Sequence, residues 1–149
     1  MCYSRITKGK ILKQAVIEAT HNFCETILCE LPQKTATLGQ YFYGSAISIL
    51  ENDVEHTWYL FFEKKVLDDI AYNLLFEENI CEDDLDDLLK EIANQIIGSA
   101  KVLLEEKYPD NTYHLNVPEF MGNVCAPFPI ELEDTHRYLI KNSSFVIAR

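Results

Sequence analysis

One segment, residues 87–98, carries a carboxylate and a carboxamide at a spacing that could do chemistry. At about 100° per residue, Asp87, Glu91, Asn94 and Gly98 fall within about 60° of one another on a helix. The apolar residues of this segment centre on the opposite face: Leu85, Leu89, Ile92, Ala93, Ile96 and Ala100. Glu91 and Asn94 are therefore expected to point outward together. A carboxylate can pair with a cation, whereas a neutral amide exchanges hydrogen bonds but is too weakly basic to act as a general base.

A glycine lies one turn beyond Asn94, at position 98. Glycine costs a helix interior about 1 kcal/mol relative to alanine, so Gly98 suggests that something must come close to this face. The group that approaches this face could belong to a partner molecule.

The composition limits the kind of molecule that carries this segment. With 149 residues, 48% hydrophobic and 11% aromatic, we expect one globular domain over residues 1–149. The formal net charge of −11 and the absence of a Lys/Arg cluster argue against nucleic acid as a ligand. No apolar run reaches the roughly 18 residues of a membrane span, and the first residues lack the apolar core of a signal peptide. These features predict a cytoplasmic protein.

The sulfur and imidazole side chains do not suggest a metal or disulfide site. The five cysteines form no C-x-x-C pair and are odd in number, which favours reduced thiols, most of them small core residues. The four histidines have no helical metal spacing with one another or with a cysteine, so we expect no metal site.

The elements that position residues 87–98 follow from periodicity. Helical spacing predicts three helices: residues 10–30, residues 64–75, and a long helix that follows the acidic stretch 77–87 and ends near Lys107. Two extended segments, 37–50 and 56–62, should form a hairpin around the polar turn 51–53. Further extended segments are expected at 112–117, 130–133 and 137–149, with an irregular stretch that contains Pro118, Pro127 and Pro129. The fold class is therefore α+β, two layers with helices packed on a mostly antiparallel sheet.

Over its whole length the chain resembles the CheX branch of the CheC/CheX/FliY family of chemotaxis phosphatases. The strongest match is an acidic-x-x-x-Glu-x-x-Asn signature with its following glycine, formed by Asp87, Glu91, Asn94 and Gly98. Residues 15–28, 43–50 and 58–62 are similar to the family's first helix, first hairpin strand and next strand. A single Glu-x-x-Asn places the chain nearer CheX, because CheC and FliY typically carry two. The chain departs from the family in the turn 51–55, which lacks the usual glycines, and in a spacing to Pro118 about one residue long.

This resemblance implies hydrolysis of the aspartyl phosphate of a CheY-like response regulator. Asn94 would hydrogen-bond the attacking water, and Glu91 would pair with the lysine that regulators keep beside the phosphorylated aspartate. Asp87 would tune the site or help to dock the regulator, and Gly98 would lie on the same partner-binding face. The resemblance also implies that Mg²⁺ is supplied by the regulator, that the chain has no cofactor of its own, and that it forms a homodimer. It does not identify the regulator.

Other interpretations stay open beside the phosphatase. Glu91 and Asn94 could be two polar residues on a solvent-exposed face, and Asp83, Asp84, Asp86 and Asp87 could be favourable charges at a helix N-terminus. The chain could be an adaptor of the chemotaxis or flagellar switch machinery that binds a response regulator without turnover. It could also be a structural dimer that pairs through an edge at 145–148. His21, Cys24 and the aromatic residues 41–43 are interpreted as packing residues.

Overall fold

The structure of the chain is a computed structural model that describes residues 4–37 and 39–149. Within that range it contains three helices and seven strands: α1 (Ser4–Leu28), β1 (Gln33–Lys34), β2 (Tyr41–Glu51), β3 (Val54–Phe62), α2 (Lys64–Leu75), α3 (Glu82–Lys107), β4 (Tyr113–Leu115), β5 (Glu119–Cys125), β6 (Thr135–Ile140) and β7 (Ser143–Ala148). The helix predicted at 64–75 has the bounds of α2. α1 begins six residues before the predicted start, and α3 begins inside the acidic stretch.

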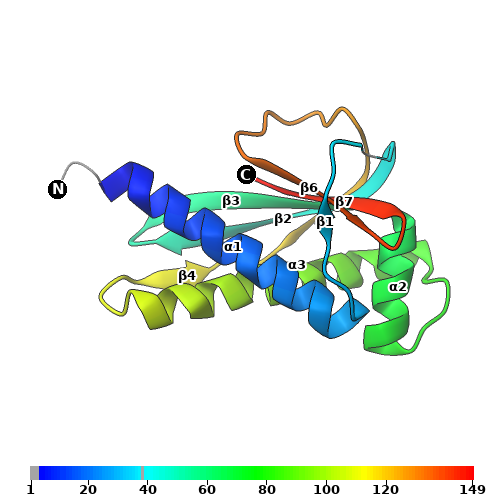
Figure 1. Ribbon diagram of the computed structural model, residues 1–149, viewed down its shortest axis with the longest axis horizontal. Helices are drawn as coiled ribbons and strands as arrows, with labels where there is room; N and C mark the ends of the chain where they lie inside the picture. Colours follow the sequence, from blue (N-terminus) through cyan, green and yellow to red (C-terminus); the bar gives the residue numbers. More distant parts are fainter. Residues whose placement is uncertain (1–3, 38) are drawn as a thin grey trace.

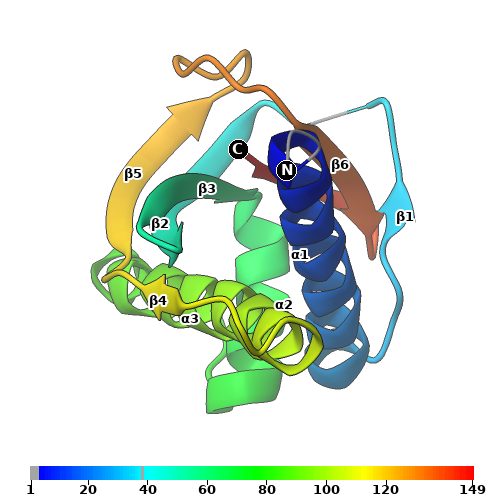
Figure 2. The ribbon, with the colours of Figure 1, turned by 90° about the vertical axis from the view of Figure 1, so that its left-hand side faces the viewer.

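The described strands form one antiparallel sheet with the helices on one side of it. The strand order is β1-β6-β7-β3-β2-β4, and β5 also pairs with β2. The sheet arches over α1 and α3 (Figures 1 and 2). The predicted α+β class, with helices packed on an antiparallel sheet, is confirmed. No helix in the described part of the chain has the length and hydrophobicity needed to cross a membrane.

Two tight turns build the hairpins of this sheet. Between β2 and β3, Asn52 and Asp53 have φ of 49° and 68°, and between β6 and β7, Lys141 and Asn142 have φ of 48° and 68°. Two successive left-handed residues match the right-handed twist of paired strands, and Asn and Asp tolerate this conformation better than most residues. The first turn therefore closes without the glycines usual in the family.

The C-terminal third differs from the prediction. β5 lies inside the stretch predicted as irregular, where it pairs with β2 around a register shift at Gly44 and Ser45. Residues 130–133 are not a strand, and 137–149 is a hairpin rather than one extended segment. The two-residue strand β1 was not predicted. The prolines and Gly122 hid the alternation of β5, whose pairing is set by β2, more than seventy residues earlier in the chain.

The predicted free edge at 145–148 is wrong. β7 lies between β3 and β6, and its residues 144–148 are buried. Both rows of its backbone groups are already used in the sheet, so this strand cannot add another chain. The dimer itself stays a prediction.

The core lies mainly between the sheet and the helices. Among the helix residues whose burial is described, α3 contributes the largest apolar stripe, and it packs on β2 and α1. A smaller cluster covers the other face of the sheet, where Phe128 stacks on Phe61 with ring centroids 4.2 Å apart. The prediction that most cysteines are core residues is wrong for the described chain: Cys24 is buried, whereas Cys29, Cys81 and Cys125 are exposed. Cys2 lies outside the described residues.

The buried stripe of α3 gives a stability prediction. Ile92→Ala should lower the free energy of unfolding by about 2–5 kcal/mol, because the side chain is fully buried and its removal leaves a cavity. Val102→Ala on the exposed side of the same helix should change it by less than about 0.5 kcal/mol. Urea unfolding followed by circular dichroism measures both, and equal effects would contradict the assignment of the two faces.

Candidate functional site

The outward face of α3 carries the residues singled out from the sequence. Asp87, Glu91 and Asn94 are exposed, and Gly98 is half-buried. The apolar residues of the opposite face are fully buried: Leu85, Leu89, Ile92, Ala93, Ile96 and Ala100. The helix thus presents a carboxylate and an amide one turn apart, on a backbone whose other side is locked into the core.

Contacts with two strands of the sheet flank this segment. The Tyr43 hydroxyl on β2 donates a hydrogen bond to Glu82 Oε1 at 3.0 Å, in the first turn of α3. Burial, and next the hydrogen bond to Glu82, raise the pKa of Tyr43, so the hydroxyl remains a donor at neutral pH. Towards the other end, Leu115 of β4 lies beside Gly98. The exposed face therefore lies between a contact of α3 with β2 and the approach of β4 to Gly98.

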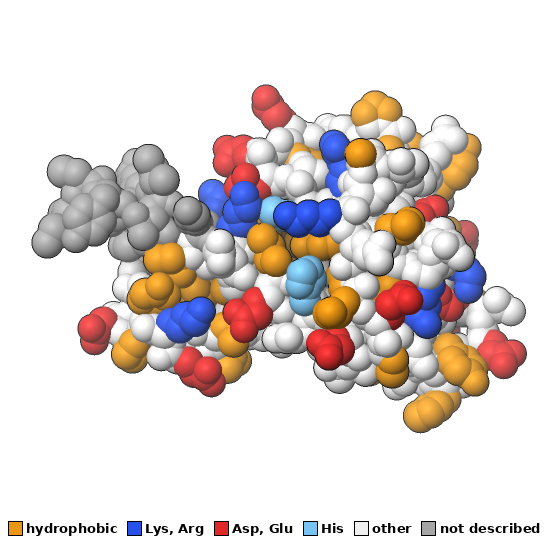
Figure 3. Space-filling model, viewed as in Figure 1, with side chains coloured by type: hydrophobic (Ala, Val, Ile, Leu, Met, Phe, Trp, Pro, Cys, Tyr) orange, Lys and Arg blue, Asp and Glu red, His pale blue; other side chains and the backbone are white. Residues whose placement is uncertain are grey.

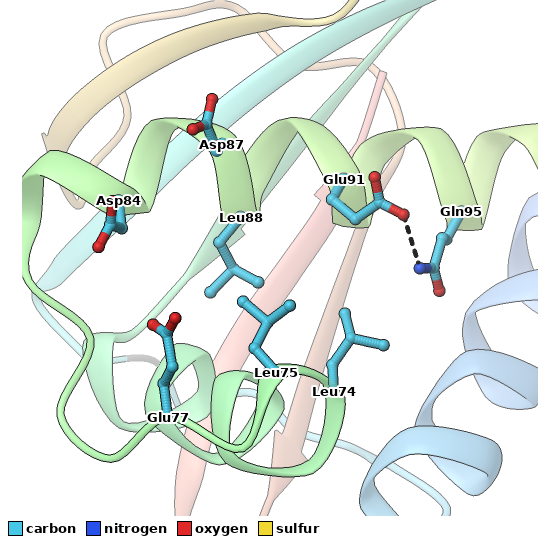
Figure 4. Close-up of a pocket in the computed structure, with 8 residues that line it drawn as sticks. All are labelled: Leu74, Leu75, Glu77, Asp84, Asp87, Leu88, Glu91 and Gln95. Carbon is cyan, nitrogen blue, oxygen red and sulfur yellow. Dashed lines mark hydrogen bonds between the residues drawn. The ribbon is translucent and has the colours of Figure 1, made fainter.

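Gln95 holds the carboxylate of Glu91, a contact that was not predicted from the sequence. Its Nε2 donates to Glu91 Oε1 at 2.9 Å (Figure 4). The i, i+4 spacing of the two residues could have revealed this pair. Gln95 also lines a small groove between α1 and α3, together with Asn22, Thr26 and Ser99. The bond restricts the Glu91 side chain and leaves its second oxygen available to an incoming donor.

Two of the three lysines of α3 are paired with carboxylates other than those of the candidate site. Lys90 Nζ lies 2.8 Å from Asp86 and Lys101 Nζ 3.2 Å from Glu105. The hydrogen bond to Asp86 raises the pKa of Lys90. Among the described residues, no Lys, Arg or His nitrogen lies within 4.0 Å of a carboxylate oxygen of Asp87 or Glu91. These two carboxylates are thus open to a cation from another molecule.

A hollow of about 500 Å³ lies beside Glu91, between α3 and the end of α2 (Figure 4). Leu74, Leu75 and Leu88 point toward one another between the two helices. Four carboxylates complete its lining with Gln95: Glu77, Asp84, Asp87 and Glu91. Glu91 lines the hollow, whereas Asn94 does not. The α2 contribution was not predicted, because residues 74–77 are far in sequence from Glu91.

The packing around Gly98 does not demand a glycine. A Cβ at this position would lie 3.7 Å from Leu115 Cδ2, which is an ordinary van der Waals contact. The chain's own packing therefore gives no reason for the glycine, and the hypothesis of a close approach at Gly98 concerns another molecule.

No group of three or more His, Cys, Asp or Glu side chains within residues 4–37 and 39–149 is arranged to hold a metal ion. The carboxylates of the hollow are spread along its edge. The expectations about Mg²⁺ and cofactors stay predictions.

The family model described as chemotaxis phosphatase CheX matches residues 45–128, which is more than half of the chain. The matched range contains β3, α2, α3, β4 and β5 in full and most of β2. No curated protein matches the sequence.

Solved structures share the fold at low sequence identity. A CheC-like chemotaxis protein from Shewanella oneidensis MR-1 has a TM-score of 0.73 at 18% identity, over 93% of this chain and 95% of that one. The chemotaxis protein CheX from Vibrio vulnificus has a TM-score of 0.71 at 17% identity, over 92% and 93%. CheX of Borrelia burgdorferi, solved as a complex with CheY, BeF3 and Mg²⁺, has a TM-score of 0.59 at 12% identity, over 91% and 94%.

The free space at position 98 gives a second prediction. Gly98→Ala should raise the free energy of unfolding by up to about 1 kcal/mol, because alanine restricts the unfolded chain and its Cβ meets no clash. Ser99→Ala on the next residue should give a smaller gain, since serine is already a better helix former than glycine. Thermal unfolding compares the two, and a loss of stability in Gly98→Ala would reveal a contact that the structure does not contain.

Proposed function

Because the chain belongs to the CheX family of chemotaxis phosphatases, we propose that it hydrolyses the aspartyl phosphate of a CheY-like response regulator and so terminates a chemotaxis signal. One observation carries this proposal. Glu91 and Asn94 are exposed together on α3, inside the range that matches the family model, with the Glu91 carboxylate held by Gln95 and open to an external cation. Response regulators act in the cytoplasm, which is where we place the protein.

The residue types suit the chemistry of an acyl phosphate. Such a phosphate is already reactive, so a catalyst has mainly to place a water in line with the phosphorus and stabilise the charge that spreads over its oxygens. The Asn94 amide can donate to and accept from that water without taking its proton. Asn94 is therefore assigned to orient the attacking water, and the proton leaves with the products through solvent or phosphate oxygens.

In this proposal, Glu91 positions the regulator relative to Asn94. A carboxylate that meets the lysine beside the regulator's phosphorylated aspartate makes a charge-assisted hydrogen bond. That bond fixes how far Asn94 enters the regulator's site. Asp87, one turn before Glu91, adds negative charge to the same contact. The Mg²⁺ belongs to the regulator, whose carboxylates hold it against the phosphate. The complex of Borrelia burgdorferi CheX with CheY, BeF3 and Mg²⁺ supports a partner of this class.

A homodimer of this chain would have to use an edge other than β7. β5 pairs only with β2 among the described strands, so one row of its backbone groups is open over seven residues. We place the dimer contact at this edge. Asn123→Pro removes a backbone donor from β5. Comparing the sedimentation of this variant with that of the wild type tests whether the β5 edge forms the dimer contact.

The water-orienting role of Asn94 gives a third prediction. Asn94→Ala should slow the dephosphorylation of the regulator by about 100-fold or more, while the Kd for the regulator stays within about twofold, because only the transition state needs the positioned water. Decay of the phosphorylated regulator in the presence of Mg²⁺ measures the rate, and titration with the BeF3-bound regulator measures the Kd.

Gln33→Ala is the matched control, since it removes an exposed amide from β1, away from α3. It should leave both quantities unchanged. A wild type that binds regulators without accelerating decay would favour the adaptor instead.

The pairing role of Glu91 gives a fourth prediction. Glu91→Gln keeps the size of the side chain and an acceptor for Gln95 but removes the charge, so KM should rise by about tenfold at low salt and by less at high salt. Glu106→Gln makes the same charge change at the far end of α3 and should leave KM unaltered. Equal effects of the two variants on KM would show that net charge, rather than the Glu91 contact, determines binding.

A further inference from the structure

The end of α2 exposes an apolar surface next to the hollow. Tyr72, Leu75 and Phe76, named here the α2-end patch, are 55%, 45% and 88% exposed. Hydrophobic side chains gather at the lower right of the molecule, over α2 and the segment after it (Figure 3). Single exposed apolar residues are ordinary on protein surfaces, but a contiguous group marks an interaction surface.

Phe76 has a backbone conformation that phenylalanine rarely adopts. It caps α2 with φ 58° and ψ 31°, in the left-handed region. Its N–H donates to the Tyr72 carbonyl at 3.1 Å, and the next N–H, of Glu77, donates to the Ala71 carbonyl at 3.4 Å. Glycine is the usual residue at such a helix end, because a Cβ is strained there. Phe76 gains neither burial nor a relaxed backbone, so stability does not explain this side chain.

The α2-end patch is continuous with the candidate site. Leu75 belongs to both the patch and the hollow, and Glu77, the next residue after Phe76, also lines the hollow. Glu91 lies at the far side of that same hollow (Figure 4). A molecule that meets Glu91 and covers the hollow therefore reaches the patch.

The lining of the hollow defines the chemistry of its occupant. Leucines from both helices lie between carboxylates of Glu77, Asp84, Asp87 and Glu91. The aliphatic stem of a lysine or arginine can pack on the leucines while its charged end meets the carboxylates. Because Glu91 lines the same hollow, a regulator that docks on Glu91 is positioned to supply such a side chain.

We propose that the α2-end patch anchors the response regulator, with an apolar surface of its receiver domain packed on Phe76 and a flanking Lys or Arg side chain placed in the hollow. This inference rests on the proposed function. It assigns α2 to recognition and α3 to chemistry. The patch acts on the ground state and the transition state alike, so its loss raises KM and leaves kcat unchanged.

Phe76→Gly is the decisive variant, because glycine relaxes the left-handed backbone while the aromatic anchor is lost. The probes are the receiver domains whose phosphorylated forms the wild type dephosphorylates, used with acetyl phosphate for turnover and with BeF3 and Mg²⁺ for binding. KM and Kd should rise by about tenfold or more, as for a buried aromatic anchor. kcat should stay within about twofold, and the Tm should be equal to or above that of the wild type. Tyr41→Ala removes an exposed aromatic residue from β2 and should leave KM unaltered.

A paired charge variant tests the hollow. Glu77→Gln combined with Asp84→Asn should raise KM and weaken its dependence on salt. Glu106→Gln combined with Asp110→Asn makes the same change in net charge at the other end of α3 and should not raise KM.

The outcomes separate this inference from the function on which it rests. If the wild type accelerates dephosphorylation but Phe76→Gly keeps the wild-type KM, or loses kcat alone, the anchor is overturned and the phosphatase stands. If Phe76→Gly converts a dimer into a monomer at unchanged KM, the patch serves a second copy and the anchor is overturned. If the wild type accelerates the decay of no receiver domain from its own genome, the proposed function and the anchor both fail.

Discussion

The burial of the apolar stripe of α3 determines how the rest of the candidate site is presented. Leu89, Ile92 and Ile96 have no exposed surface, so the helix cannot rotate without bringing apolar area into water, at roughly 25 cal/mol per Å². Glu91 and Asn94 need no contact with each other to share a direction, since the core on the opposite side imposes it. The Tyr43–Glu82 hydrogen bond then fixes the start of the helix against β2. The packing of the buried face of α3 therefore sets the direction in which Glu91 and Asn94 point.

Short-range ion pairs, rather than the net charge of the chain, decide which carboxylates of α3 are free to bind a partner. The chain carries a net charge of −11, yet two of the three lysines of α3, Lys90 and Lys101, pair with Asp86 and Glu105, each one turn away on the same helix. This arrangement leaves Asp87 and Glu91 without a cation among the described residues. Response regulators are commonly acidic as well, so a long-range field would oppose the encounter. In the proposed complex, affinity must come from short-range contacts, and the hollow and the adjoining apolar patch offer surfaces for such contacts beside Glu91.

Local patterns predicted the helices well and the later strands poorly. The i, i+3 and i+4 spacing of Val66, Leu67 and Ile70 identified α2 with its bounds, because a helix satisfies its backbone within one segment. β5 was missed and 130–133 was wrongly taken as extended, because a strand depends on a partner elsewhere in the chain. The same dependence explains the error at 145–148. Nothing in those residues indicates that β6 will take one side of β7 and β3 the other.

The sequence by itself determined the fold class and the presence of a long helix with one apolar and one polar face. It also determined which residues lie on the polar face: Asp87, Glu91, Asn94 and Gly98. These follow from spacing within one segment and need no knowledge of distant residues. Only the tertiary structure decided that Gln95 holds Glu91 and that Leu74 and Leu75 of α2, with Glu77 just after it, complete a hollow beside Glu91. It also decided that Phe76 stands exposed in a left-handed conformation next to that hollow. The physical reason is that pockets and exposed patches are made between elements, where side-chain volume and chain direction decide the contacts and periodicity carries no information about them.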